Sequence, residues 1–165
     1  MDYLLTDEQI MLKEMVAKFA KERISPVASD NEKNHRFPAD IIKEAAELGL
    51  MGIAYPEEYG GAGMDYVSYM LALEEISRYC ASTGVIISAH SSLVCDPIYR
   101  FGTEEQKQKY LPDLLSGNKI GSFSLTEAGA GSDAGATKTT AKLVDDKWVL
   151  NGSKQFATNG KEADI

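Results

Sequence analysis

Apolar residues recur at helical spacing through the first two thirds of the chain. Thr6 to Gln9 has the pattern of a capping box, and apolar positions from Leu12 to Ala20 follow at i, i+3, i+4 and i+7. They predict an amphipathic helix that ends or kinks at Pro26. A second helix is predicted after Pro38, with Gly49 as its stop. Its inward positions are predicted to be Ile41, Ile42, Ala45 and Leu48.

Three further helical segments follow, after a Pro- and Gly-rich stretch at residues 56–63 that predicts a loop. Asp65 is the predicted N-cap of a helix that reaches about Cys80. Its inward face is predicted to hold Met70, Leu73, Ile76 and Cys80. The segment 82–99 is apolar nearly all round, which predicts a central helix. Thr103 to Gln106 repeats the capping-box pattern, and Gly117 ends the helix it opens.

After Gly117 the pattern alternates, which predicts strands. The predicted strands cover residues 120–126, 139–144 and 147–150, with Asp145-Asp146 as a short turn. Asn151-Gly152 is a two-residue hairpin signal that leads to a further strand through Thr158. The predicted fold class is therefore α+β, with an all-α domain over residues 1–118 and an antiparallel β domain beginning at residues 119–165. Four strands with open edges are an incomplete sheet, so we expect the chain to be truncated within that domain.

Charge supports the same division and excludes some partners. The net charge of −8 lies entirely in residues 1–115, while residues 116–165 carry six basic and six acidic residues. No lysine or arginine cluster is present, which argues against nucleic acid and anionic membranes. The start of the chain lacks the basic and apolar regions of a secretory leader. The uncharged run 79–95 is too short to span a membrane. We therefore expect a cytoplasmic protein.

The cysteines and histidines do not indicate a metal or redox centre. Cys80 and Cys95 are not a CxxC pair, and they are expected to be free thiols packed as small apolar residues. His35 and His90 have no histidine or cysteine at ligand spacing. No metal site is therefore predicted.

The densest candidate site is the segment FSLTEAGAGSD at residues 123–133. A predicted strand leads into a Gly-rich turn, where successive N–H groups can form an anion nest and hydroxyls add donors. A pyrophosphate or the polar edge of a ring would suit it, although a bare turn of this composition is also common between strands. Gly129, Gly131 and Gly135 do not have the spacing of a dinucleotide fingerprint, and a strand-like segment follows, so a nicotinamide Rossmann site is excluded.

A second candidate is Phe156-Ala157-Thr158. On a strand, Phe156 and Thr158 would share a face, so they could pack on a planar cofactor and bond its edge. A core Phe beside a surface Thr is the alternative. For catalysis the sequence offers little: Glu127 and Asp133 lie near the Gly-rich turn but read as turn or cap residues, and other acidic pairs lie on predicted solvated helix faces.

Together these segments resemble the acyl-CoA dehydrogenase family. FSLTEAGAGSD followed by LNGSKQFATNG is similar to the two flavin-binding segments of that family. YGGAG at residues 59–63 and FGTEEQK at residues 101–107 are also typical of it. TGVIISAHSSL at residues 83–93 resembles the short-chain, butyryl-CoA branch. The resemblance covers essentially the whole chain, in order and without large gaps.

The resemblance implies an all-α domain, a β-barrel-like middle domain and a C-terminal helical bundle, of which the last would lie beyond Ile165. It implies FAD as cofactor and α,β-dehydrogenation of a short-chain acyl-CoA. A glutamate from the absent bundle would take the α-proton, and electrons would pass to an electron-transfer flavoprotein. It also implies a homo-oligomer, a dimer or tetramer, when full length.

Carried over residue by residue, the family motifs assign nine cofactor-binding positions: Phe123, Ser124, Leu125, Thr126, Gly131, Ser132, Phe156, Ala157 and Thr158. Thr126 would bond the flavin's pyrimidine edge, and Gly131 with Ser132 would hold the pyrophosphate. Ser132 would also meet the CoA part of the substrate, and Thr158 would lie near the reactive nitrogen. Relatives often have Trp-Ile-Thr where this chain has Phe156-Ala157-Thr158, so the wall around the flavin is expected to be smaller.

Two hypotheses follow. The chain is part of an FAD-dependent dehydrogenase, or it is a non-catalytic piece that serves only as a folded partner-binding module. Acyl-CoA oxidases and nitroalkane oxidases are less similar at YGGAG and FGTEEQ. Because the implied catalytic glutamate lies outside residues 1–165, the chain by itself is expected to be inactive.

Overall fold

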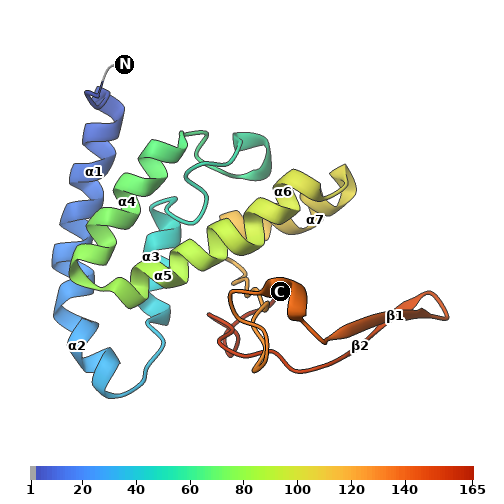
Figure 1. The fold of residues 1–165 in the computed structure, drawn as a ribbon. Helices are drawn as coiled ribbons and strands as arrows, with labels where there is room; N and C mark the ends of the chain where they lie inside the picture. The colour runs from blue at the N-terminus through green and yellow to red at the C-terminus, as the bar shows by residue number, and fades with distance from the viewer. Residues whose placement is uncertain (1–2) are drawn as a thin grey trace.

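The chain folds into a group of packed helices followed by an irregular region with one β-hairpin (Figure 1). The structure is a computed structural model that describes residues 3–165. Met1 and Asp2 belong to the segment in which no secretory leader is predicted, and they lie outside the described residues. Within residues 3–165 no helix is long and apolar enough to cross a membrane.

The first helices are α1 (Asp7–Phe19), the π-helical turn η1 (Ala20–Ile24), α2 (Ser25–Lys33), α3 (Ala39–Glu47), the 3₁₀ turn η2 (Glu57–Tyr59) and α4 (Tyr66–Tyr79). They are followed by α5 (Ala81–Ser88), the π-helical η3 (Ala89–Cys95), α6 (Asp96–Phe101), α7 (Glu104–Leu115), the 3₁₀ turn η4 (Ala134–Ala136) and the strands β1 (Thr140–Val144) and β2 (Lys147–Asn151).

The local helix signals are confirmed. Thr6 and Thr103 each accept a bond from the backbone three residues on, and Gln9 and Gln106 bond back to complete both capping boxes. Pro26 lies in the first turn of α2, after η1, so it marks a boundary as predicted. The predicted helix over 82–99 is observed as α5, η3 and α6 in succession.

Two predicted inward positions are wrong. Leu48 is 42% exposed and Met70 is 58% exposed. On α4 the buried stripe instead holds Ser68, Tyr69, Ala72, Glu75 and Ile76. The polar Glu75 can be buried there because Lys13 lies 3.6 Å away on α1 and Arg78 lies 3.3 Å away. The ion pairs therefore offset the cost of burying Glu75 on the face that also buries Tyr69, Ala72 and Ile76.

The core has two parts. The larger one joins α1, α3, α4 and α5 around side chains such as Val16, Ile42 and Ile76. The smaller one joins the segment around Tyr55 and Tyr59 to η3 and α7. The thiol of Cys95 is buried in the smaller core, and Cys80 is half-buried. All of this packing lies in the helical region, whereas β1 and β2 are exposed along their whole length.

The β region is sparser than predicted. β1 and β2 pair antiparallel, with Thr140 opposite Asn151 and Val144 opposite Lys147. The turn Asp145-Asp146 has positive φ at both residues, as a two-residue hairpin requires. In Figure 1 the hairpin extends away from the helices. The predicted strands over 120–126 and through 158 are wrong, because those segments make scattered backbone bonds and no continuous ladder.

Candidate functional site

The first candidate segment runs over the surface after α7. Phe123 and Leu125 are 42% and 45% exposed, Ser124 is exposed and Thr126 is half-buried. The next four residues form a tight turn, since Glu127 and Ala130 exchange two backbone bonds of 3.0 and 3.1 Å. The segment therefore shows apolar side chains and a closed Gly-containing turn on one stretch of surface.

The turn is open where a ligand would approach. A Cβ built on Gly129 or Gly131 would meet nothing within 4 Å. Gly131 and Ser132 are exposed. Within residues 3–165, the Ser132 hydroxyl takes part in no hydrogen bond. A donor-rich, uncrowded turn of this kind suits an anionic group.

The second candidate segment departs from the predicted strand at Phe156. This residue has a φ of +59° and is 84% exposed, and it is followed by exposed Ala157 and half-buried Thr158. A positive φ at a bulky residue is uncommon, and it breaks the alternation of a strand. The expectation that Phe156 and Thr158 share one strand face is therefore wrong.

Three hydrogen bonds hold the two segments side by side. Gln155 donates its backbone N–H to the Thr126 carbonyl at 2.9 Å. The Ser122 hydroxyl donates to the Thr158 carbonyl at 2.8 Å, and Lys154 Nζ donates to the Leu125 carbonyl at 2.9 Å. Residues about thirty positions apart in sequence thus meet at the predicted site.

A cavity of about 340 Å³ lies between the segments. Residues 127–129, Ala136, 138–139 and 152–155 line it. The nine predicted cofactor-binding residues flank this cavity in sequence but do not line it. A single groove shared by Thr126, Ser132 and Thr158 therefore stays a prediction.

The Glu127 carboxylate is held by several hydrogen bonds, so it is poorly suited to act as a general base. Its carboxylate accepts from Lys154 Nζ at 2.8 Å, from the Lys138 amide at 2.7 Å and from the Thr139 amide at 3.0 Å. The Lys154 ammonium, with these amide donors, holds the pKa of Glu127 well below its usual range. Sequence reasoning missed Lys154 altogether. No local signal could have paired it with a carboxylate 27 residues earlier.

A second buried polar cluster joins the helices to this region. The His90 ring is fully buried on η3, and its Nδ1 accepts from the Gly121 amide at 3.0 Å. Its Nε2 lies 3.0 Å from the Leu114 carbonyl and so carries the proton. Burial lowers the pKa of His90. The Asn159 amide adds bonds to the Ile86 and Gly121 carbonyls.

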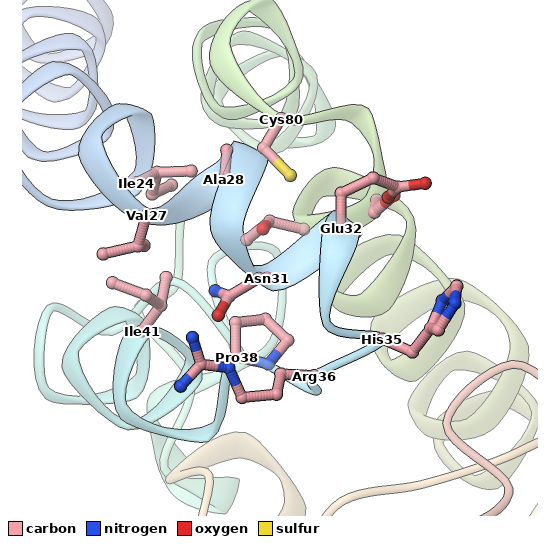
Figure 2. A pocket seen from close by; sticks show the side chains of 12 residues that line it. Ile24, Val27, Ala28, Asn31, Glu32, His35, Arg36, Pro38, Ile41 and Cys80 are labelled. Carbon is pink, nitrogen blue, oxygen red and sulfur yellow. The ribbon is translucent and has the colours of Figure 1, made fainter.

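The structure also contains a smaller pocket of about 120 Å³ in the helical region (Figure 2). It lies between α2, α3 and the start of α5, with Cys80 and His35 among its lining residues. The Arg36 guanidinium at its edge pairs with Asp30. None of the predicted site residues contributes to this pocket, and no sequence motif indicated it.

Comparison with known families matches both regions. Residues 6–118 match the acyl-CoA dehydrogenase N-terminal domain, and residues 122–165 match the acyl-CoA dehydrogenase middle domain. A short-chain specific acyl-CoA dehydrogenase of Clostridium acetobutylicum is 50% identical over 99% of this chain and 43% of its own length. The chain therefore spans about two fifths of the length of that curated relative.

Solved structures of acyl-CoA dehydrogenases are also similar to this chain. The butyryl-CoA dehydrogenase of Megasphaera elsdenii superposes with a TM-score of 0.94 at 40% identity, over 99% of this chain and 44% of the other. An acyl-CoA dehydrogenase of Bacillus anthracis, complexed with FAD, gives a TM-score of 0.91 at 42% identity, over 97% of this chain and 28% of the other. The predicted α+β class and the family resemblance are thereby confirmed.

Proposed function

We propose, since this chain belongs to the acyl-CoA dehydrogenase family, that it forms the helical and cofactor-facing part of an FAD-dependent enzyme that dehydrogenates short-chain acyl-CoA thioesters. The observation that carries the proposal is the contact between the two candidate segments, where the Gln155 amide bonds the Thr126 carbonyl. The short-chain assignment is supported by the names of the relatives from Clostridium acetobutylicum and Megasphaera elsdenii.

The residues at this site fit a flavin dinucleotide. Phe123, Leu125 and Phe156 leave apolar surface bare, which a planar ring would cover. The Ser132 hydroxyl is free of bonds within residues 3–165, and the turn around Gly131 is open. An apolar area beside polar donors is the composition expected of a cofactor site.

Each of the nine residues receives a role in this proposal. Phe123, Leu125 and Thr126 line the ring, with the Thr126 hydroxyl on its pyrimidine edge, and Ser124 belongs to the same cofactor-binding segment. Gly131 and Ser132 hold the pyrophosphate, and Ser132 also contacts the CoA moiety. Phe156, Ala157 and Thr158 pack on the ring from the second segment. When bound, FAD supplies the two-electron acceptor for the substrate's β-hydride.

The α-proton needs a base that this region does not provide. Glu127 is the carboxylate nearest the site in sequence, but its oxygens are occupied by three donors. A general base must reach the α-carbon proton with a pKa near the working pH, and Glu127 is shifted in the opposite direction. We therefore assign the base to a glutamate outside residues 1–165.

The remaining parts of the proposal concern the whole protein. We assign residues 1–118 to the helical domain and 119–165 to the start of the β domain. The enzyme would act in the cytoplasm as a homo-oligomer and pass electrons to an electron-transfer flavoprotein.

The test is to purify the protein produced from its gene and measure its flavin content and its reaction with butyryl-CoA. Bound FAD whose absorbance bleaches on addition of butyryl-CoA, with turnover once an artificial acceptor is present, supports the proposal. A colourless protein that takes up no added FAD would favour the alternative, a partner-binding module without catalytic activity.

A further inference from the structure

Glu127 and Lys154 form a cluster that connects three separate stretches of the chain. The carboxylate binds the amides of Lys138 and Thr139 at the start of the hairpin segment, and it pairs with Lys154 at 2.8 Å. Lys154 Nζ also donates to the Leu125 carbonyl at 2.9 Å. Two side chains thus connect residues 125–127, 138–139 and 154.

The cluster is partly shielded from water. The Glu127 side chain is 10% exposed and that of Lys154 is 24% exposed. Partly buried ions are costly when one partner is removed, because the other charge is left uncompensated. Glu127 remains a carboxylate at neutral pH, since its pKa lies well below the usual range. The pair is therefore persistent under ordinary conditions.

Glu127 and Lys154 lie next to the two predicted flavin-binding segments in sequence. Glu127 directly follows Thr126 and begins the Gly-rich turn, which its backbone closes onto Ala130. Lys154 lies two residues before Phe156. Each member of the pair is therefore close in sequence to residues predicted to bind the flavin. The backbone hydrogen bond from Gln155 to Thr126 is a second direct contact between the same two stretches of chain.

Neither hydrophobic core of residues 3–165 includes this arrangement. The hairpin beyond residues 138–139 is exposed on both strands, and Phe123, Leu125 and Phe156 are also exposed. Where apolar packing is absent, polar contacts must fix the backbone. Small displacements of cofactor-holding groups are costly to function, so such contacts act as positioning elements.

We infer that Glu127 and Lys154 are positioning residues that align the two cofactor-binding segments and order the Gly-rich turn between them. This inference rests on the proposed function, because it takes the segments to be the flavin site. Neither residue is assigned contact with the reacting atoms. Their effect on the flavin is exerted through the Leu125 carbonyl and through the amides of Lys138 and Thr139.

The test compares Lys154→Met, Lys154→Arg and Glu127→Gln in the protein produced from its gene. Lys142→Met is the matched control, since Lys142 is exposed on β1 and its ammonium forms no ion pair or hydrogen bond with residues 3–165. The first readouts are the dissociation constant of FAD from flavin fluorescence and hydrogen exchange of the Lys138 and Thr139 amides without FAD. Visible circular dichroism of bound flavin reports its local environment.

We expect Lys154→Met and Glu127→Gln to weaken FAD binding by about tenfold, since each removes a charge-assisted bond. Amide exchange at Lys138 and Thr139 should be faster in both variants. Lys154→Arg should restore affinity and the flavin dichroism, because Arg keeps the charge and can donate twice. The control should behave as the wild type.

Unchanged FAD affinity in Lys154→Met, with a wild type that binds FAD, overturns the inference alone. A wild type that binds no FAD overturns the proposed function, and the positioning role with it. Loss of the helical signal in Lys154→Met would assign the pair a purely structural role and also overturn the inference, because the pair lies outside the helical cores.

Discussion

His90 should be the most sensitive single position for the stability of the helical region. Its ring is fully buried and satisfies two backbone groups, the Gly121 amide and the Leu114 carbonyl, each at 3.0 Å. His90→Leu has a similar volume but makes neither bond. Each buried group left unpaired costs about 1–3 kcal/mol, so the free energy of unfolding should fall by about 2–6 kcal/mol.

Urea unfolding followed by far-UV circular dichroism measures this loss. Ser92→Ala is a suitable control, because Ser92 lies on the same π-helical segment but is exposed, and its hydroxyl donates to the Ser88 carbonyl one turn earlier. We expect it to change stability by less than about 0.5 kcal/mol. Hydrogen exchange at Gly121 should accelerate in His90→Leu only. A His90→Leu protein as stable as the wild type, with unchanged exchange at Gly121, would refute the reasoning.

His90 also predicts the direction of a pH dependence. Burial lowers its pKa below the ordinary value of 6.5. Below pH 6.5 the unfolded chain therefore binds a proton that the folded chain does not, and stability falls as the pH decreases. Above pH 6.5 both states are neutral and this contribution is constant. In His90→Leu the slope below pH 6.5 should be smaller, and an unchanged slope would contradict the assignment.

Three other predictions follow from the structure. Gly121→Ala should destabilise the protein by about 1–3 kcal/mol, because a Cβ there would lie 2.6 Å from Val94 Cγ1. Gly129→Ala is the control in the same unfolding assay, because a Cβ at Gly129 would meet no atom within 4 Å. Thr126→Ala and Thr158→Ala should each weaken FAD binding by about 0.5–1.5 kcal/mol in a fluorescence titration, and normal flavin content and potential in both would contradict their assignment. A polypeptide of residues 1–165 mixed with FAD and butyryl-CoA should show no turnover above free flavin, because the Glu127 carboxylate is fully engaged; turnover that Glu127→Gln abolishes would identify Glu127 as a base.

Local signals in the sequence predicted local structure well. The capping boxes at Thr6 and Thr103 each involve residues three apart, and both are observed. The Asp145-Asp146 turn needs only positive φ at adjacent residues. In such cases the interaction that fixes the local structure joins residues only a few positions apart, so it can be predicted from the sequence.

Features that depend on distant partners were not predictable in the same way. The buried stripe of α4 includes Glu75, which pairs with Lys13 on α1, and periodicity cannot reveal such a pair. The strand predicted through Thr158 fails at Phe156, whose positive φ is not encoded in an alternating pattern. The Glu127–Lys154 pair joins residues 27 positions apart. The first and the third of these outcomes depend on a contact between residues that are distant in sequence.

Two polar clusters hold different parts of the chain near the predicted site. His90 and Asn159 attach the helical region to Gly121, where the irregular region begins. Glu127 and Lys154 fix the two candidate segments to each other. His90 is fully buried among the helices, whereas the Glu127–Lys154 pair lies outside both apolar cores of residues 3–165. Substitutions in the first should therefore change the free energy of unfolding of the helical region, and substitutions in the second should change flavin affinity while the helical cores stay intact.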